Sequence, residues 1–262
     1  VPFWDRAFAL TEAREVINPR PLDQAAIFRK YAELTNGFIT YSEGCNDDVN
    51  KCVWSALGWD PDADPTSILR EYARYYLHHS LAEPFAQGLL ALERNWRGPA
   101  MTNEQIETTL AQFQAMERAA PPAVRRNWRF QQALYRACYD AYVRRRVIHE
   151  THLENQARDA LRAARVTGSL SAMARAEEIL DRAVTEPVAV ELRGRIGELA
   201  EALFQSIRMQ LSVEKYGAIE ASRGASQDTL DMPLNDRPWL KERFAAIRKI
   251  EHETERLGAL DQ

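Results

Sequence analysis

The 262-residue sequence has few cysteines, and the three present, Cys45, Cys52 and Cys138, are irregularly spaced. An odd number of unevenly spaced cysteines excludes a disulfide framework, and no CxxC pair indicates a metal or redox centre. We therefore expect small, partly buried thiols. No apolar run approaches the roughly 20 residues that a membrane-spanning helix needs, so we expect no membrane partner. The sequence has neither an initiator methionine nor a signal peptide, and we expect Val1 to be the end of a processed chain or of a fragment.

An excess of basic charge is absent as well. The 34 lysines and arginines are outnumbered by 38 aspartates and glutamates, which gives a net charge of −4. Proteins that bind nucleic acids usually carry a strongly basic face, so we expect no nucleic-acid partner. The short basic run RRR at residues 144–146 has Asp140, Glu150 and Glu154 around it at helical spacing. This pattern predicts a solvated face of ion pairs on a long helix.

Motifs for nucleotide binding and for metal binding are missing. The sequence contains no P-loop, no GxGxxG and no GxSxG, so we expect no cofactor. His149 and His152 are three residues apart, whereas the zinc motif HExxH separates its histidines by four. Because Glu154 is the only obvious further ligand, we expect an exposed helix face here and no metal site.

Helical periodicity dominates what the sequence does contain. Apolar residues recur every three or four positions in segments such as 102–119, 127–164, 171–185, 188–216 and 239–257. Breaks rich in proline and glycine separate these segments. Over residues 64–262 we predict an all-helical bundle of about six or seven helices, whose short connections favour antiparallel neighbours.

Residues 1–63 are predicted to differ from this bundle. The segment FITY at residues 38–41 is β-branched and aromatic and follows a glycine, which predicts the one strand of the chain. Asn46 or Asp47 can cap the next helix, with Asp48 in its first turn. The order helix, strand, polar turn and helix is typical of a βα unit, in which functional groups follow the carboxyl end of the strand.

Polar side chains and tryptophans gather between Gly37 and Asp60. They are Tyr41, Ser42, Glu43, Asn46, Asp47, Asp48, Asn50 and Lys51, with Trp54 and Trp59 beside them. Carboxylates and amides bind sugar hydroxyls, and aromatic faces bind the apolar side of a sugar ring, so the stretch indicates a carbohydrate site. Glu43, at the predicted end of the strand, is the best candidate for a catalytic acid, base or nucleophile.

A structural interpretation of these residues stays open. The aspartates can cap a helix, Lys51 can pair with Asp47 one turn away, and the tryptophans can be core residues. Trp4, Asp5 and Arg6 form a second polar and aromatic cluster, for which a structural role is also open.

Two segments, VPFWDRAFALTEAREVINPRP at residues 1–21 and GFITYSEGCNDDVNKCVWSALGWDPDAD at residues 37–64, resemble a group of large bacterial glycoside-hydrolase-like proteins. The segments ALERNWRGP, NWRFQQALYRA and LDMPLNDRPWL look like the helical part of the same group. These proteins combine a (β/α)8 barrel with a following helical domain. The resemblance covers essentially the whole chain.

The resemblance implies a mostly α fold in which residues 1–63 are the last βα units of a barrel and residues 64–262 are the helical domain. It implies a periplasmic or extracellular location. It also implies that Glu43 lies at the mouth of the barrel, surrounded by the candidate substrate-binding residues Trp4, Asp5, Arg6, Tyr41, Asp47, Asp48, Asn50, Lys51 and Trp54.

A whole barrel takes roughly 200–250 residues, so strands one to six would lie outside this sequence. We therefore expect this chain alone to be inactive as a hydrolase. The uncovered apolar faces of an incomplete barrel lead us to expect self-association. The alternative function is a non-enzymatic helical module with a structural or protein-interaction role.

Overall fold

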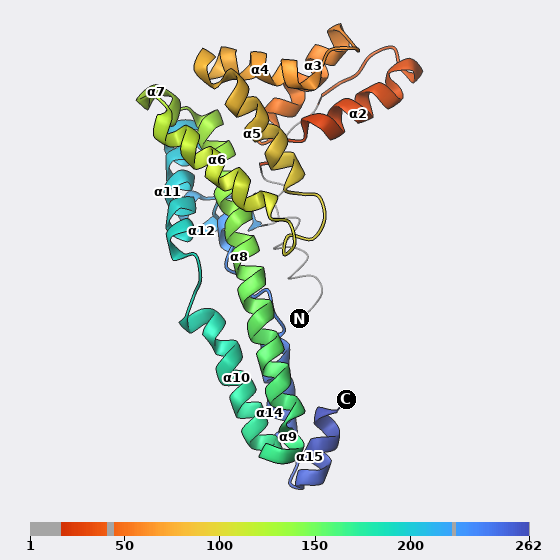
Figure 1. The fold of residues 1–262 in the computed structure, drawn as a ribbon, viewed down its shortest axis with the longest axis vertical. Helices are drawn as coiled ribbons and strands as arrows, with labels where there is room; N and C mark the ends of the chain where they lie inside the picture. The colour runs from red at the N-terminus through yellow and green to blue at the C-terminus, as the bar shows by residue number, and fades with distance from the viewer. Residues whose placement is uncertain (1–16, 41–44, 222–223, 262) are drawn as a thin grey trace.

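The computed structural model describes residues 17–40, 45–221 and 224–261, and Figure 1 shows their fold. The fold is 73% helical, and none of the described residues forms a β-strand. This confirms the prediction of a mostly α protein. The elements are α2 (Pro21–Tyr31), η2 (Ala32–Leu34), α3 (Asp48–Trp59), α4 (Pro65–Tyr76), η3 (His79–Leu81), α5 (Ala82–Arg94), α6 (Gln105–Ala119), α7 (Pro122–Arg125), α8 (Trp128–Arg162), α9 (Ala164–Thr167), α10 (Ser169–Thr185), α11 (Val190–Ile207), α12 (Val213–Tyr216), α13 (Ser226–Thr229), α14 (Arg237–Ile247) and α15 (Glu253–Leu260).

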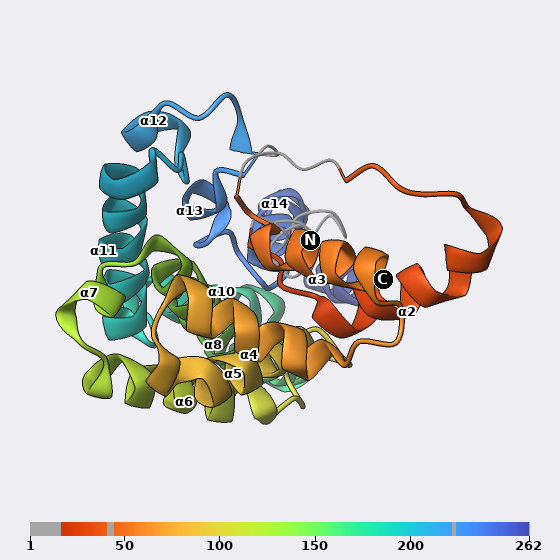
Figure 2. The same cartoon turned by 90° about the horizontal axis from the view of Figure 1, so that it is seen from above.

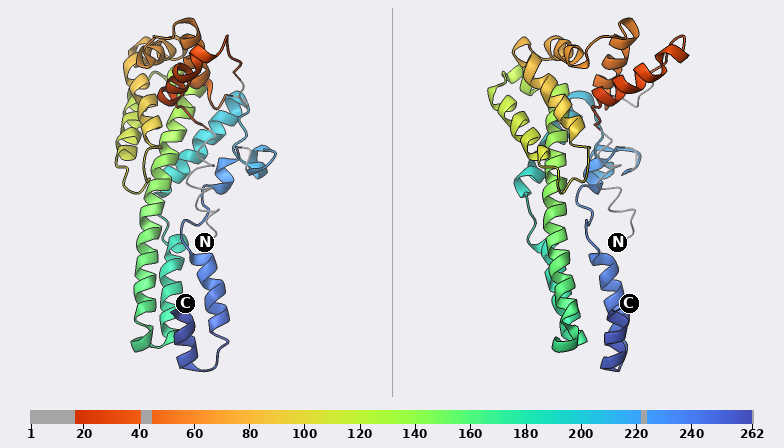
Figure 3. Two further views of the ribbon diagram at one scale, coloured as in Figure 1. Left: turned by 90° about the vertical axis from the view of Figure 1, so that its right-hand side faces the viewer. Right: turned by 45° about the vertical axis from the view of Figure 1, so that its right-hand side comes forward.

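The molecule is elongated and has two parts, termed here the head and the stalk (Figures 1 and 3). The head contains α2 to α7 and α11 to α13 around the first half of α8, as the view from above also shows (Figure 2). The stalk contains the second half of α8 with α9, α10, α14 and α15. Helix α8 has 35 residues, a length of about 50 Å at 1.5 Å per residue, and it runs through both parts.

Helix α8 begins where the sequence predicts. Asn127 at its N-cap accepts a hydrogen bond through Oδ1 from the Arg129 backbone N–H at 2.9 Å. The side-chain Nδ2 of Asn127 donates to the Tyr76 carbonyl oxygen at 2.8 Å, which ties this helix start to the end of α4. A side chain that accepts from an otherwise unpaired N–H stabilises a helix start.

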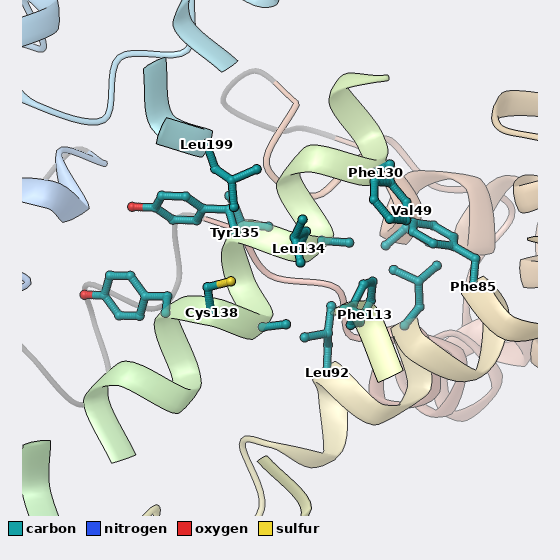
Figure 4. Close-up of a cluster of buried hydrophobic side chains, with 14 of the residues drawn as sticks. Val49, Phe85, Leu92, Phe113, Phe130, Leu134, Tyr135, Cys138 and Leu199 are labelled. Carbon is teal, nitrogen blue, oxygen red and sulfur yellow. The ribbon is translucent and has the colours of Figure 1, made fainter. Parts of the chain in front are cut away.

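Two hydrophobic cores lie along α8. In the head core (Figure 4), Phe130, Leu134, Tyr135 and Cys138 of α8 pack with Val49, Phe85, Leu92, Phe113 and Leu199 from the surrounding helices. The stalk core consists of Leu153, Ala157, Met173, Ala176, Ile179, Leu180, Phe244 and Ile247. Because α8 contributes to both cores, it is the element that joins the head to the stalk.

The charged residues of α8 correct the prediction of a solvated ion-pair face. Asp140, Glu150 and Glu154 are 1%, 2% and 5% exposed. Arg136 Nη2 lies 2.7 Å from Asp140 Oδ1, and Arg146 Nη2 lies 2.5 Å from Glu150 Oε1. Arg146 of the basic run pairs with Glu150 as the helical spacing predicts, whereas Asp140 pairs with Arg136, which lies outside the run. Neighbouring elements cover both pairs, and buried charges are tolerated only when they are paired.

The predicted strand at residues 38–41 is wrong over its described part. Phe38, Ile39 and Thr40 have no strand structure, and Tyr41 lies outside the described residues. A strand must pair its backbone N–H and C=O groups with another strand, and the described part of the chain supplies none. Instead the Phe38 ring packs edge-on against Phe28 and Trp54, with centroids 5.8 Å and 5.4 Å away.

The helix predicted after this segment does form, as α3. Asp47 occupies its N-cap position and Asp48 its first turn, although the Asp47 side chain makes no capping hydrogen bond. Phe28 of α2 and Leu57 of α3 belong to the same core as Leu69 of α4. The core of the head thus extends across residue 63, where the sequence divides the chain into two predicted domains. That division stays a prediction.

Candidate functional site

Asn50 fixes the chain segment that leads into α2. Its side chain is buried, and Oδ1 accepts a hydrogen bond from the Arg20 backbone N–H at 2.8 Å. Its Nδ2 donates to the Asn18 carbonyl oxygen at 2.7 Å. Residues 18–20 include Pro19 and form no helix or strand, so their backbone groups depend on partners such as this amide. Asn50 positions α2 against α3.

Glu93 of α5 caps the beginning of α2 from outside. Its Oε2 accepts from the Leu22 backbone N–H at 2.8 Å, and its Oε1 accepts from that of Asp23 at 2.7 Å. The first N–H groups of a helix have no partner within the helix, and Arg20 at the N-cap makes no side-chain cap bond. Burial raises the pKa of Glu93, while the two hydrogen bonds oppose this rise. Glu93 thereby sets the position of α2 on α5.

Trp54 joins α3 to α2. Its ring centroid lies 5.3 Å from that of Phe28 in an edge-on contact, and its Nε1 donates to Gln24 Oε1 at 2.6 Å. A paired indole N–H and aromatic neighbours fix the orientation of the ring. Trp54 is half-buried, whereas Trp59 is 93% exposed. The interpretation of both tryptophans as core residues therefore fits only Trp54, and only in part.

A pocket of about 200 Å³, termed here the α2–α3 pocket, opens beside these residues. It is lined by Gln24, Ile39, Thr40, Asp47, Asn50, Lys51 and Trp54. The structure thus brings together four of the predicted substrate-binding residues. Lys51 Nζ lies 4.0 Å from Asp47 Oδ1, the predicted pairing one helical turn apart. Among the described residues this oxygen is buried without a hydrogen-bond partner.

Asp48 is engaged away from the α2–α3 pocket. Its Oδ2 accepts from the Tyr72 hydroxyl at 2.7 Å and from Arg129 Nε at 2.8 Å. The Arg129 guanidinium lies 3.8 Å from the Tyr76 ring centroid and 4.0 Å from that of Trp128. Burial and the Asp48 carboxylate raise the pKa of Tyr72, so its hydroxyl stays a donor. Asp48 therefore has partners that give it a structural role.

Several candidate residues lie outside the described part of the chain. They are Trp4, Asp5, Arg6, Tyr41 and Glu43. The catalytic role of Glu43 and the substrate-binding role of the other four therefore stay predictions.

The three thiols are free, as expected for a chain without a disulfide framework. Cys45 and Cys52 are half-buried and Cys138 is buried. Burial raises the pKa of all three, that of Cys138 to about 12. A thiol with a raised pKa stays protonated at neutral pH and is a poor nucleophile. None of the three has the environment of a catalytic cysteine.

Gln24 and Thr40 line the α2–α3 pocket but were not predicted as site residues. Gln24 lies on α2, 30 positions before its partner Trp54, and a single glutamine on an amphipathic helix carries no signal of its own. Thr40 was assigned to the predicted strand. Gln24 joins the site because α2 and α3 pack side by side, and Thr40 joins it from the segment between them. The local sequence encodes neither arrangement.

No family model, no curated protein and no solved structure matches this chain. Within the ranges that the structure describes, no helix combines the length and the apolar character needed to cross a bilayer. Those ranges also hold no group of three or more His, Cys, Asp or Glu side chains placed to bind a metal ion.

Proposed function

We propose that the α2–α3 pocket binds a carbohydrate. The observation that carries this proposal is that Asp47, Asn50, Lys51 and Trp54 line one pocket. A hydroxyl group both donates and accepts, so it can donate to the Asp47 carboxylate while accepting from the Lys51 ammonium. The buried Asp47 Oδ1, which lacks a hydrogen bond from any described residue, supports this assignment because such an atom gains most from a ligand donor.

The size of the α2–α3 pocket supports a single sugar ring. A cavity of about 150 Å³ holds benzene, and this pocket is larger, at about 200 Å³. Its wall combines amide, carboxylate, ammonium and indole groups, the mixture that a hydroxylated ring with one apolar side requires. The proposed ligand is a monosaccharide or the terminal unit of an oligosaccharide.

The wider form of this proposal is that the chain is the C-terminal part of a glycoside-hydrolase-like protein. In this form residues 1–63 come from the last part of a (β/α)8 barrel, although residues 17–40 and 45–63 form no strand, and the helical part is an accessory domain. Glu43 supplies one catalytic carboxylate. The sequence resemblance supports it, as does the position of Thr40 and Asp47, which flank Glu43 in the sequence and line the α2–α3 pocket.

Isothermal titration calorimetry with common monosaccharides and short oligosaccharides tests the binding step. Asp47→Ala and Lys51→Ala should each weaken binding about tenfold or more, because a hydrogen bond to a charged group contributes about 1.5–3 kcal/mol. Asp62→Ala and Lys249→Ala remove the same kinds of side chain at exposed positions outside the pocket and should leave the affinity unchanged. Absence of binding to every sugar, or equal losses in pocket and control variants, would overturn the proposal.

Hydrolysis of aryl glycosides by the protein that contains this chain tests the role of Glu43. Glu43→Gln keeps the size of the side chain and removes its acid–base chemistry, so the rate should fall by about 10²–10⁴-fold. An active protein whose rate is unaffected by this substitution shows that Glu43 is not catalytic. That result would leave sugar binding at the α2–α3 pocket intact.

The second candidate function is a non-enzymatic interaction module. It is favoured by apolar side chains that are exposed on α3 and on the segment before it. Ile39 is 98% and Trp59 is 93% exposed. The residues that precede them in the sequence are in contact, because the Phe38 ring lies so close to Gly58 that a Cβ there would be 2.6 Å from it. A second copy of the chain presents the same side chains, so this surface can pair with itself. Sedimentation velocity should show a dimer that Trp59→Ser abolishes, and a monomer at every concentration argues against this candidate.

A further inference from the structure

A second pocket, of about 210 Å³, lies where the head joins the stalk, and it is termed here the junction pocket. Its walls come from the middle of α8 at residues 142–150, from the end of α10 and the connection after it at residues 183–188, and from residues 231–237, which lead to the start of α14. Figures 1 and 3 show both connections passing between the head and the stalk. The junction pocket shares no lining residue with the α2–α3 pocket.

A buried ion pair on α8 holds one wall of the junction pocket in place. Arg146 donates to the carbonyl oxygens of Leu230 and Met232 at 2.6 Å and 2.8 Å, and its Nη2 lies 2.5 Å from Glu150 Oε1. The other oxygen of Glu150 accepts from the Leu234 backbone N–H at 2.8 Å. Both side chains bond the connection that leads to α14 onto α8, and this wall of the pocket is thereby held in place.

The other charged groups of this wall are also matched. Asp231 accepts from the Tyr142 hydroxyl and from Arg193 Nε, both at 2.7 Å. Arg237 donates through Nε to Asp181 at 2.5 Å. Each described carboxylate and guanidinium of the wall thus has an oppositely charged partner. Burying a further charge without such a partner is costly. The junction pocket is therefore suited to a neutral ligand.

Asn235 lines the junction pocket and has an unsatisfied donor. Its side chain is fully buried at 0% exposure, and Oδ1 accepts from the Arg237 backbone N–H at 3.0 Å. This bond fixes the orientation of the amide, because a backbone N–H requires the oxygen and not the nitrogen. Nδ2 is buried without a hydrogen-bond partner among the described residues. A buried donor without a partner is costly and calls for an acceptor in the pocket.

His149 also lines the junction pocket and has a second unsatisfied atom. Its Nε2 is buried and has no hydrogen-bond partner among the described residues. Burial lowers the pKa of His149 below its ordinary value, so the ring is neutral at neutral pH. A neutral imidazole nitrogen donates in one tautomer and accepts in the other. A ligand hydroxyl satisfies either tautomer, because it can both donate and accept.

The remaining wall is apolar, and the pocket has the size of a ring. Its apolar lining residues are Ala183, Val184, Pro187, Val188 and Pro233. A cavity of about 150 Å³ binds benzene, so a pocket of about 210 Å³ accepts a substituted ring. We propose that the junction pocket binds a neutral, ring-sized molecule with a hydroxyl group, which accepts from Asn235 Nδ2 and bonds to His149 Nε2.

Phenols, cyclic alcohols and monosaccharides share this chemistry, and NMR titration of the isotope-labelled chain distinguishes them. The probes are phenol, cyclohexanol, glucose and N-acetylglucosamine, with benzene as the ring without a hydroxyl. At least one hydroxylated probe should shift the side-chain amide signals of Asn235 and bind about tenfold more tightly than benzene, the difference expected for one additional hydrogen bond in a buried site. The proposal is wrong if no probe shifts these signals, or if benzene binds as tightly as the hydroxylated probes. Water would then be the hydrogen-bond partner of the unsatisfied atoms.

Three variants test whether the probe binds in the junction pocket. Ala183→Leu fills the pocket with an apolar side chain and should abolish binding, and His149→Phe keeps the ring size and should weaken it about tenfold. His152→Phe is the matched control, because His152 is an exposed ring on the same helix that contacts Gln156. Unchanged binding in Ala183→Leu would overturn the proposal even if His149→Phe misfolds.

The two pockets are distinguished by where sugar binding is lost. Sugar binding that disappears in Lys51→Ala and persists in Ala183→Leu belongs to the α2–α3 pocket. The reverse result places it in the junction pocket. Failure of one proposal therefore leaves the other intact.

Discussion

Asp48 of α3 and Arg129 of α8 form an ion pair across 81 positions of the sequence, with Arg129 Nε 2.8 Å from Asp48 Oδ2. The second nitrogen of the guanidinium, Nη2, lies 3.3 Å from Oδ1, so the contact is forked. The pair is only about one-fifth exposed, with side-chain exposures of 18% and 21%. It fixes α3, and with it the α2–α3 pocket, onto the central helix of the head.

Arg129→Lys should lower the free energy of unfolding by about 1.5–3 kcal/mol, since lysine loses the forked hydrogen bonds and the contacts with the Tyr76 and Trp128 rings. Urea denaturation followed by circular dichroism measures this loss. The control is Arg74→Lys in the exposed ion pair with Glu71, where the loss should stay below about 1 kcal/mol. Equal losses at the two sites would show that the Asp48–Arg129 pair contributes no more than a surface pair.

The buried pair Arg136–Asp140 should be more sensitive to the loss of one partner. Both residues are 1% exposed, and Asn95 Nδ2 donates to Asp140 Oδ2 at 2.9 Å. Asp140→Ala leaves the Arg136 charge buried without its carboxylate, which should cost about 3–5 kcal/mol of unfolding free energy.

The matching double variant, Arg136→Met with Asp140→Val, should be less destabilised than Asp140→Ala alone. An apolar pair of similar volume removes both charges and the cost of burying them. Thermal unfolding of the single and double variants gives the comparison. A double variant that is less stable than Asp140→Ala contradicts this account.

Two helical glycines should respond to alanine in opposite directions. At Gly88 of α5 an added Cβ would lie 2.9 Å from Cζ and 3.1 Å from Cε2 of the fully buried Phe113 ring. Overpacking there should cost about 1–3 kcal/mol, more than the about 1 kcal/mol that alanine gains in a helix. Gly194 of α11 has no atom within 4 Å of such a Cβ, so Gly194→Ala should stabilise the protein by up to about 1 kcal/mol.

Differential scanning calorimetry measures both glycine variants. The melting temperature should fall for Gly88→Ala and rise for Gly194→Ala. A rise at Gly88 would show that the Phe113 ring moves aside at little cost.

Glu253 makes the stalk sensitive to acid. Its carboxylate accepts from the hydroxyl and the backbone N–H of Ser169, both at 2.6 Å, and from Arg256 Nη2 at 2.7 Å. These bonds lower the pKa of Glu253 from 4.5 to about 2. The lowered pKa means that the stabilisation is complete above about pH 4.5 and is lost as the pH falls toward 2.

Melting temperatures between about pH 5 and pH 2.5 test this dependence. The wild type should lose more stability over this range than Glu253→Gln, which cannot ionise. Glu255→Gln, at an exposed position on the same helix, is the control and should follow the wild type. Parallel curves for wild type and Glu253→Gln would contradict the assigned role of Glu253.

The sequence predicted much of the secondary structure, because helix formation depends on neighbours in the chain. The long helix expected over residues 127–164 is α8, and the helix expected after Asn46 is α3. Caps and apolar spacing within one or two turns carry this information. The strand at residues 38–40 failed because strand formation depends on a partner elsewhere, and local propensity does not supply one.

The sequence also singled out Asp47, Asn50, Lys51 and Trp54, whose pocket is formed partly by close neighbours on α3. The sequence did not distinguish these four residues from Asp48, whose side chain has hydrogen-bond partners outside the pocket. Those partners, Tyr72 and Arg129, are 24 and 81 positions away. Which of two adjacent aspartates faces a pocket and which is used in packing was decided by the tertiary structure.

The middle of α8 also shows what the sequence alone does not determine. Helical spacing alone correctly indicated that Arg146 and Glu150 pair, because residues four apart lie on one side of a helix. Whether that side is solvated or buried depends on what covers it, and here the connection between α13 and α14 does. Only the tertiary structure brings Asn235 and His149 to one pocket, because burial results from contacts between residues far apart in the chain.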